Sequence, residues 1–584
     1  MIVGSENLII KSGFDYVITS LRFDLKTISI WYSVFYTLRF IGLFYKSEWF
    51  KVLYRILFLV LFLASLVFGL IAVFYFPISK NIVGFEVFQL IGGQEFSVIL
   101  GYIIDYWYAI AGALLLLFLV YKVYVQTHLE LSTRQRLIFS IVSVLVIAFF
   151  ARGGFALKPL NLLDAYAALD SKEAISAVTP TYVLIESLGK KELEEVAYFS
   201  LEEVKEELEK DQLDLLNLGF EKPNICLILL ESFGKEYTSI NNVGRPSYTP
   251  FLDSLMRQSV YFSNAYANGL RSMDAVASTM VGIPSMMKKP FIGSLYTQNS
   301  SASIQQELTD IGYYTSFYHA ADELSMGFKP FLKSKGLNNY FGKQQYPDPV
   351  HFDGTWGIFD YPYLEYCSEK LGEQRQPWIS GIFTLSSHHP YTVPSEFQYL
   401  ENGTAEIHQS VRYTDAALRN FFETSRKEEW FDKTIFIVTA DHTSINETPE
   451  FQTYRGKYAV PLMIYSPSLF GPKKVEQIVQ HMDIYPTILQ MAGKKSTVSM
   501  GRSLLDTMKR DVIHYDGNVY VITNDSLSLQ WNGVTKYELF EYKSDPAHTK
   551  DITEEKEVEG DEMFNALKMF IQKFNYRLLN DDFN

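Results

Sequence analysis

The sequence predicts two parts: an N-terminal α-helical transmembrane bundle, followed by an α/β domain with a mostly parallel central sheet covered by helices. Two observations support this division. Apolar residues are concentrated in the first 150 positions, whereas from about residue 222 short β-type apolar runs alternate with helical patterns. Long apolar runs are typical of membrane-crossing helices, and strands that alternate with helices are typical of parallel sheets.

Four apolar stretches in the first quarter of the chain predict three or four membrane spans. The two strongest are VLYRILFLVLFLASLVFGLIAVFYF at 52–76 and YWYAIAGALLLLFLVYKVYV at 106–125, each near the roughly 20 residues that a crossing helix needs. RLIFSIVSVLVIAFFARGG at 136–154 is shorter but continuous. ISIWYSVFYTLRFIGLFY at 28–45 is interrupted by Arg39, so the alternative there is an interfacial or core helix.

Basic residues in the short connections predict the orientation of this bundle. Two connections are expected in the cytoplasm because they carry Lys46, Lys51 and Arg55, and Lys122, Arg134 and Arg136. The connection at 77–103 has little positive bias and is expected outside, as is everything after about residue 152. The prediction is a multi-pass protein of the cytoplasmic membrane with an extracytoplasmic catalytic domain. Four spans would also place the N-terminus outside, for which the two explanations are a preceding span absent from this sequence and an internal start at Met1. Residues 1–27 show no cleavable signal.

The patterns divide the chain into four segments. They are a transmembrane domain at 1–151, a connector at 152–216, an α/β domain at 217–550 and a charged C-terminal helix or tail at 551–584. The connector contains KKELEEVAYFSLEEVKEELEKDQLDLL, in which apolar residues recur at near-helical spacing among glutamates. This pattern predicts an amphipathic helix with one solvated face.

Five β-type runs predict the strands of the sheet. They are NICLILLES, YYTSFYHA, PWISGIFTLSSHHP, TIFIVTADH and PLMIYSP, with helical patterns such as TPFLDSLMRQS and YTDAALRNFFETS between them. In such sheets ligands bind at the carboxyl ends of the strands. Polar residues that follow these runs are therefore candidate site residues.

Charge and cysteine content exclude some classes of function. A net charge of −14 argues against a nucleic-acid partner, since phosphate backbones are bound by basic surfaces. The two cysteines, Cys226 and Cys367, lie in no CxxC or zinc-type pattern, so we expect inert packing residues.

Three polar residues follow two of the predicted strands. Glu231 follows the apolar run of NICLILLES, and Asp441 and His442 end TIFIVTADH. Because the parallel-sheet rule brings both strand ends to one edge, two carboxylates and an imidazole should converge into a cation site. Ser272 in NGLRSMDA is the expected fourth ligand and nucleophile, since a metal-bound hydroxyl loses its proton more readily. The alternative for Ser272 is helix capping.

Seven motifs follow one another in an order that is informative as a set. They are NICLILLESFG, NGLRSMDA, FYHA, TLSSHHPY, TADHTS, PLMIYSP and HMDIYPTIL. Over roughly residues 222–508 this order resembles the lipoteichoic acid synthase branch of the alkaline phosphatase and sulfatase superfamily. The resemblance implies a sulfatase-like domain in which Glu231, Ser272, Asp441 and His442 bind one divalent ion, Mn²⁺, Mg²⁺ or Zn²⁺. It also implies that His319 and His388 flank the phosphate or its glycerol; the alternative for His319 is a core histidine that closes a strand. A threonine is the usual nucleophile in this branch, and Ser272 keeps the hydroxyl.

Several further residues each have two interpretations. Arg271 either contacts the phosphate or is solvated, and Trp356 in DGTWGIFD either lines the substrate cleft or packs in the core. His388 and His389 are adjacent and point to opposite faces of an extended chain, so only His388 is predicted to face the site. In HMDIYPTIL, a supporting role is predicted for the histidine and aspartate, His481 and Asp483, rather than metal binding.

Together these features predict a membrane-anchored, metal-dependent transferase. It would move a phosphoglycerol or related phospho-head group from a phospholipid such as phosphatidylglycerol to an envelope glycan or glycolipid acceptor, through a covalent Ser272 intermediate. The alternatives are a sulfatase-like hydrolase or phosphodiesterase, a phosphoethanolamine transferase, and a degenerate binding or sensor protein. The C/S-x-P-x-R setting of sulfatases is missing at Ser272, which is followed by MDAVA.

Overall fold

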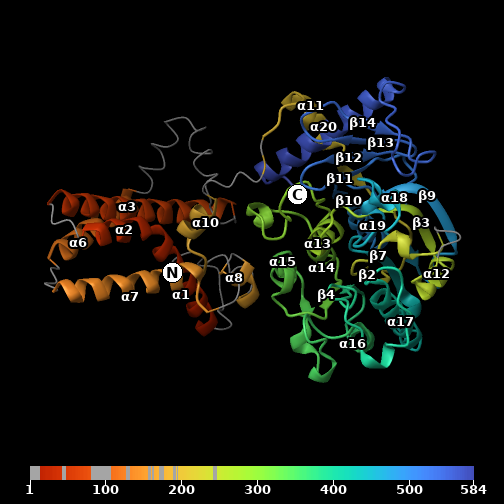
Figure 1. Cartoon of the computed structure of the whole chain (residues 1–584), viewed down its shortest axis with the longest axis horizontal. Coiled ribbons are helices and arrows are strands. Elements are labelled where there is room, and N and C mark those ends of the chain that lie inside the picture. Colours follow the sequence, from red (N-terminus) through yellow and green to blue (C-terminus); the bar gives the residue numbers. More distant parts are fainter. Residues whose placement is uncertain are drawn as a thin grey trace. The chain divides into compact units, whose positions relative to one another are not determined.

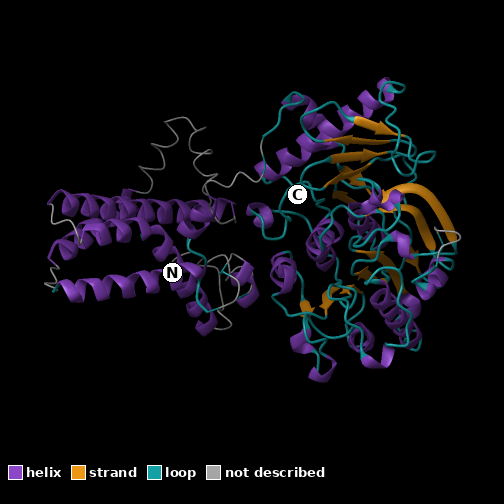
Figure 2. Ribbon diagram, viewed as in Figure 1, coloured by secondary structure: helices purple, strands orange, loops and turns teal. Residues whose placement is uncertain are grey.

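The computed structural model divides the chain into two compact units, Met1–Lys191 and Glu192–Asn584 (Figure 1). It describes residues 13–42, 48–79, 107–126, 132–155, 159–160, 163–169, 177–187, 193, 195–240 and 246–583. Over these ranges the first unit is built from helices, and the second combines helices with three β-sheets (Figure 2).

The predicted apolar stretches fall on helices of the first unit where the structure describes them. The stretches at 52–76, 106–125 and 136–154 form helices α3, α6 and α7. The stretch at 28–45 is divided between α1 and α2, which meet at Tyr32. The connection predicted at 77–103 lies outside the described residues from position 80 onward. The helices are α1 (Gly13–Trp31), α2 (Ser33–Gly42), α3 (Glu48–Ser79), α6 (Trp107–Gln126), α7 (Thr133–Arg152), α8 (Leu163–Ala168) and α10 (Pro180–Ser187).

Within these described ranges, no helix combines the length and the apolar character that crossing a membrane requires.

The connector helix α11 (Leu201–Glu209) is shorter than the amphipathic helix predicted from the sequence. Ser200 caps its first turn, because its hydroxyl accepts the amide of Glu203 while its own amide donates to the Glu203 carboxylate. The amides of Tyr198 and Phe199 donate instead to the side chain of Gln572. A tertiary contact therefore helps to fix where this helix begins.

An eight-stranded sheet forms the centre of the second unit, in the order β5-β4-β6-β2-β7-β8-β3-β9. Neighbouring strands are parallel except at β8, which is antiparallel to both β7 and β3. The mostly parallel sheet is thus confirmed, with one reversed strand. The strands are β2 (Asn224–Leu230), β3 (Val260–Tyr266), β4 (Tyr314–His319), β5 (Asn339–Phe341), β6 (Trp378–Phe383), β7 (Thr434–Ala440), β8 (Leu462–Tyr465) and β9 (Lys473–Gln480).

Two groups of helices lie on opposite sides of strands β2, β4 and β7 (Figure 1). On one side α12 (Pro250–Met256), α16 (Asp360–Gly372) and α17 (His408–Ser425) share a hydrophobic core with alternate residues of β2. On the other side α13 (Ser272–Val281), α14 (Ile304–Thr309) and α19 (Ile484–Met491) pack together. Because both faces are covered, every residue of β2 is buried. Cys226 and Cys367 are free and buried in the first of these cores. Two short helices, α15 (Phe328–Ser334) and α18 (Pro449–Gln452), complete this part.

The predicted charged tail folds back onto the second unit. It forms α20 (Glu557–Asn580), which contacts β12 and β13 of a four-stranded antiparallel sheet. The carboxylate of Asp211, just after α11, forms ion pairs with two residues of this helix. The nitrogen-to-oxygen distance is 2.6 Å for Lys573 and 3.0 Å for Arg577. The sheet contains β11 (Val512–Tyr515), β12 (Tyr520–Thr523), β13 (Ser528–Trp531) and β14 (Glu538–Phe540), and a further pair joins β1 (Gln212–Asp214) to β10 (Ser496–Val498).

Candidate metal centre

Neighbouring parallel strands deliver polar residues to one edge of the central sheet. The register pairs Leu230, at the end of β2, with Ala440, at the end of β7, so Glu231 and Asp441 follow at the same level. Strand β4, which ends at His319, runs in the same direction through β6. Strand β3 also runs parallel to β7, because both are antiparallel to β8. The strand ends therefore meet at one edge, where the sequence pattern predicted a site.

Ser272 is the first residue of α13, the helix that follows β3. Its side chain is buried, and its Oγ donates to Oε2 of Glu231 at 3.1 Å and lies 3.4 Å from Nε2 of His442. Arg271 occupies the N-cap position of the helix and makes no side-chain capping bond. The alternative of Ser272 as a helix cap is therefore wrong, and its hydroxyl faces the two groups with which it was expected to converge.

Glu231, Asp441 and His442 form a compact cluster beside this hydroxyl. One ligand atom from each residue lies within 4.8 Å of the others. Nε2 of His442 is 3.2 Å from Oδ2 of Asp441 and 3.8 Å from Oε1 of Glu231. Both carboxylates are buried, and the His442 side chain is 13% exposed. Two carboxylates, an imidazole and a hydroxyl are thus brought together from three separate parts of the sequence.

The hydrogen bonds of this cluster fit a divalent cation. Nδ1 of His442 lies 2.6 Å from the carbonyl oxygen of Thr443, to which it donates, so the neutral ring turns the lone pair of Nε2 toward the carboxylates. Oδ1 of Asp441 accepts the amides of Ser232 and His442, but its buried Oδ2 has no hydrogen-bond partner. Oxygen and imidazole donors suit Mn²⁺, Mg²⁺ or Zn²⁺. A bound cation would give a partner both to Oδ2 of Asp441 and to the lone pair of Nε2 of His442.

The titration of the cluster also reflects its excess of negative charge. Burial, together with the nearby Glu231, raises the pKa of Asp441 above its usual range. Burial alone would lower the pKa of His442, but the carboxylates of Asp441 and Glu231 outweigh it, and the pKa is raised. A cation bound among these groups would offset this charge.

The loop that leads to Ser272 is held by Asp274. Nε and Nη2 of Arg271 donate to its two carboxylate oxygens at 2.8 and 3.1 Å, and the guanidinium also donates to Ser285 and to the carbonyl of Lys288. The Arg271 side chain is nevertheless 36% exposed. A Cβ at Gly269 would lie 2.2 Å from Cβ of Asp274, so glycine permits this close turn. Hydrogen bonds to Asp274, Ser285 and Lys288 therefore hold the guanidinium of Arg271, which is next to Ser272 in the sequence.

His319 ends strand β4 and is fully buried between Phe328 and Phe383. Its Nδ1 lies 3.2 Å from the hydroxyl of Tyr340, and its Nε2 has no hydrogen-bond partner. Burial, with a smaller effect of His388, lowers the pKa of His319 to about 3. The ring is therefore neutral at physiological pH and offers a hydrogen bond rather than a positive charge.

His388 and Trp356 pack against each other, with ring centroids 4.5 Å apart. Nε1 of Trp356 donates to the carbonyl of His389 at 2.7 Å, and Trp356 is 37% exposed, so it is not a core residue. A Cβ at the neighbouring Gly357 would lie 2.2 Å from the carbonyl oxygen of Ala320. This close approach seats the segment against the end of β4, while the side chain of His389 is exposed.

Residues 384–388, here named the 384–388 turn, contain functional candidates that the sequence analysis missed. The amide of Glu231 donates to Oγ1 of Thr384 at 2.9 Å, and Oγ of Ser387 donates to the carbonyl oxygen of Glu231 at 2.5 Å. The signal was present in TLSSHHPY, because this hydroxyl-rich stretch directly follows a predicted strand. Its hydroxyls bond to the backbone of a metal-ligand candidate.

His481 and Asp483 lie outside the cluster of Glu231, Asp441 and His442. Burial lowers the pKa of His481 to about 3, and its Nε2 is 3.4 Å from Oγ1 of Thr439. Asp483 pairs with Arg510 at 3.1 Å.

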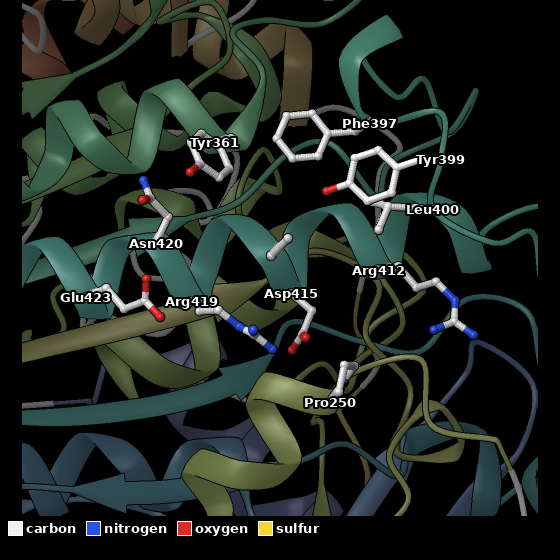
Figure 3. Close-up of a pocket in the computed structure, with 11 residues that line it drawn as sticks. Pro250, Tyr361, Phe397, Tyr399, Leu400, Arg412, Asp415, Arg419, Asn420 and Glu423 are labelled. Atoms are coloured by element: carbon white, nitrogen blue, oxygen red, sulfur yellow. The ribbon is translucent and has the colours of Figure 1, made fainter.

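A cavity of about 360 Å³ lies along α17, with the side chains of its lining drawn in Figure 3. Aromatic rings of Tyr361, Phe397 and Tyr399 form part of its wall. Asp415, which also lines the cavity, accepts the amides of Phe251 and Leu252 at the start of α12. No metal-ligand candidate lines this cavity, so the candidate chemistry lies at the sheet edge instead.

Comparison with known proteins agrees with this assignment. Residues 223–494 match the family described as Sulfatase. Over 308 residues the chain is 22% identical to lipoteichoic acid synthase-like YvgJ of Bacillus subtilis, covering 48% of this chain and 49% of that protein. Over 305 residues it is 25% identical to phosphoglycerol transferase I of Escherichia coli, covering 48% of this chain and 39% of that protein. The chain thus spans about half or less of the length of these relatives.

A solved structure shares the fold. The lipoteichoic acid synthase LtaP from Listeria monocytogenes superposes with a TM-score of 0.56 and 17% identity, covering 65% of this chain and 98% of that one. At this identity the likeness shows a common fold. The family match and the curated relatives confirm the resemblance that the motif order predicted and the expected class, a sulfatase-like phosphotransferase or hydrolase.

Proposed function

We propose, from the premise that residues 223–494 form an enzyme domain of the sulfatase type, that the chain transfers phosphoglycerol from a phospholipid to an envelope glycan or glycolipid. The observation that carries this proposal is the position of Ser272, whose Oγ is 3.1 Å from Glu231 and 3.4 Å from His442. The names of the two relatives, a lipoteichoic acid synthase-like protein and a phosphoglycerol transferase, support the choice of group.

In this proposal Glu231, Asp441, His442 and the Ser272 hydroxyl hold one divalent ion. When bound, the ion favours loss of the hydroxyl proton and offsets negative charge on the phosphate. Ser272 also lies at the N-terminus of α13, a helix of 10 residues, where the helix dipole favours an anion. In this proposal the bound ion and the N-terminus of α13 therefore both favour the deprotonated Oγ of Ser272.

The reaction has two balanced halves. In the first, Oγ of Ser272 loses its proton and bonds to phosphorus, while the bond from phosphorus to the diacylglycerol oxygen breaks and that oxygen takes up a proton. In the second, a hydroxyl of the acceptor loses its proton and bonds to the same phosphorus, while the bond from phosphorus to Oγ breaks and Oγ of Ser272 takes up a proton. Water in place of this acceptor would give a hydrolase with the same first half.

Residues around the cluster are proposed to bind the head group. His388, in the turn that bonds to Glu231, packs against Trp356, and this half-exposed pair would contact the glycerol or the phosphate. His319 would supply a neutral hydrogen bond. Arg271, although held by Asp274, adds positive charge beside Ser272 that favours a phosphate.

We also propose that the apolar helices anchor the chain in the cytoplasmic membrane, with the catalytic unit outside. The lengths of the apolar stretches and the basic residues in two connections support this arrangement. An anchored enzyme stays beside a lipid donor. Outside the cell no ATP is at hand, so cleavage of the lipid ester supplies the free energy.

The direct test uses the full chain, purified in detergent and loaded with Mn²⁺. It is incubated with phosphatidylglycerol or phosphatidylethanolamine, each with a labelled head group. We expect diacylglycerol release and labelled protein from phosphatidylglycerol, about one metal ion per chain, and loss of both reactions after chelation. A peptide carrying the label should contain Ser272.

Other outcomes would replace the proposal. Release from phosphatidylethanolamine alone would make the protein a phosphoethanolamine transferase. Release from neither lipid, with cleavage of a sulfate ester, would make it a sulfatase. Absence of a stoichiometric metal and of every activity would indicate a binding protein.

A further inference from the structure

Asp360 is a buried carboxylate outside the metal cluster, yet its bonds lead to the candidate site. It is the first residue of α16 and is 1% exposed. Its Oδ1 accepts the amide of Leu385 at 2.7 Å, and its Oδ2 accepts the amide of Ser386 at 3.0 Å and the hydroxyl of Thr414 at 2.7 Å. Its own amide donates to Oγ of Ser386 at 2.9 Å. Asp360 thus fastens the middle of the 384–388 turn to two helices.

Both ends of this turn reach the site. At the start, Thr384 accepts the amide of Glu231. Near the end, Ser387 donates to the carbonyl of Glu231, and the amide of His388 donates to the carbonyl of Leu385 at 2.9 Å. A displacement of the turn would therefore move His388 and the backbone of Glu231 together.

We propose that Asp360 is a positioning residue for the transfer reaction, which holds the 384–388 turn and thereby sets the place of His388 and Glu231. This inference rests on the proposed function. A single carboxylate can accept two amides and a hydroxyl at once, and charge-assisted bonds of this kind hold geometry more firmly than neutral ones. Supporting residues that orient metal ligands commonly change affinity or activity by about 10- to 100-fold when they are lost.

The ionisation of Asp360 is compatible with this role. Burial raises its pKa to about 6, while the bonds from Thr414, Leu385 and Ser386 act in the opposite direction. The group is therefore mainly ionised at pH 7.5 and above, where it has only acceptor atoms to offer.

The test variant is Asp360→Asn in the full chain, assayed for head-group release from phosphatidylglycerol with Mn²⁺. An asparagine has one acceptor oxygen, and its NH₂ group would meet the donors of the turn. We expect kcat/KM to fall about 10- to 100-fold, with KM for the lipid raised at least about fivefold because His388 is displaced. A purely structural defect would lower the amount of active enzyme, and so kcat, without changing KM.

A matched control is Asp415→Asn. Asp415 is also a buried carboxylate that accepts two consecutive amides, those of Phe251 and Leu252, but these open α12 and not the 384–388 turn. We expect KM within about twofold of wild type, even if the melting temperature falls as much as in Asp360→Asn. An equal rise of KM in both variants, or an unchanged KM in Asp360→Asn, would overturn the inference.

If Asp360→Asn does not fold, the variant Thr414→Val tests the positioning role of Asp360 instead. It removes one donor to Asp360 while nearly keeping the side-chain volume, and it should raise KM, whereas a wild-type KM would overturn the inference. Ser272→Ala is assayed in parallel. Full activity in that variant would refute the proposed function, while an inactive Ser272→Ala beside an unaffected Asp360→Asn would refute the positioning role alone.

Discussion

At the scale of single residues, the nucleophile candidate depends on the proton positions of its two neighbours. The Glu231 carboxylate accepts the hydrogen bond of Ser272, and Nδ1 of His442 donates to the carbonyl of Thr443, so that Nε2 faces the carboxylates and, in the proposed metal-loaded enzyme, the ion. A hydroxyl between such groups can lose its proton at lower cost than in water. The reactivity proposed for Ser272 thus comes from side chains that lie far from it in the sequence.

Removal of this hydroxyl should abolish the reaction. Ser272→Ala should reduce diacylglycerol release by about 10³-fold or more, because loss of a covalent nucleophile normally costs several orders of magnitude. Ser272→Thr, which keeps the hydroxyl, should restore much of the rate. Circular dichroism should remain near wild type in both variants, and the threonine variant should also keep its metal content. Turnover in the alanine variant above about a tenth of wild type would exclude Ser272 as the nucleophile.

The raised pKa of Asp415 should make the free energy of unfolding of the protein depend on pH. Burial raises the pKa of this acid to about 7, above its unfolded value of about 3.9. Its stabilising contribution is therefore complete below the unfolded pKa and is lost as the pH rises through about 7, by at most about 1.4 kcal/mol per pH unit. The wild type should lose stability relative to Asp415→Asn between pH 5 and pH 8. Denaturant unfolding of both proteins measures this, and a gap that is constant with pH would contradict it.

At the scale of elements, the site is built from short segments that directly follow strands. The register of β2 and β7 places Glu231 and Asp441 side by side, and the 384–388 turn joins the end of β6 to Glu231. The segment that carries Trp356 packs close to the end of β4. The strand register fixes how far along the sheet each site residue lies, and the turn that follows the strand fixes the orientation of its side chain.

The close approach at Gly357 can be tested by adding one methyl group. In Gly357→Ala, Cβ would meet the carbonyl oxygen of Ala320 at 2.2 Å and Leu385 at 2.7 Å, so the segment must shift. We expect a loss of about 1–3 kcal/mol in stability and weaker lipid binding, because Trp356 moves relative to His388. The control Gly372→Ala has no neighbour closer than 3.5 Å. Equal stability and KM of the two variants would contradict this account.

At the scale of the whole molecule, the chain comprises a helical unit and a catalytic unit. Within the catalytic unit, the C-terminal helix α20 is tied to the connector through Asp211, Lys573 and Arg577. These buried ion pairs hold the beginning of the second unit against its own C-terminal helix.

The proposed membrane topology predicts opposite results for two reporter fusions. A reporter after residue 155 should be active outside the cell, and one inserted between residues 126 and 133 should be active in the cytoplasm, because basic residues flank that connection. Phosphatase and fluorescent-protein fusions read the two sides independently. The reverse pattern would place the catalytic unit on the side without the proposed acceptor.

The sequence by itself determined the class of the larger unit and the identity of the clustered residues. Fully apolar strands such as NICLILL and TIFIVTA must be buried on both faces, and parallel strands end at a common edge. Glu231, Asp441 and His442 were therefore predictable as neighbours. Ser272 was the expected fourth ligand of this cluster, whereas His319 and His388 were implied only by the family resemblance that the order of motifs carries.

Only the tertiary structure decided which further residues hold this site. Asp360, Thr384 and Ser387 act through hydrogen bonds to residues that are 25 to 156 positions away, and no local pattern marks such partners. The direction of strand β8 could not be predicted either, because its run of apolar residues is compatible with a parallel or an antiparallel strand. Hydrophobic periodicity records which faces are buried, whereas the direction of a strand and the partner of a buried polar atom depend on the packing of the whole domain.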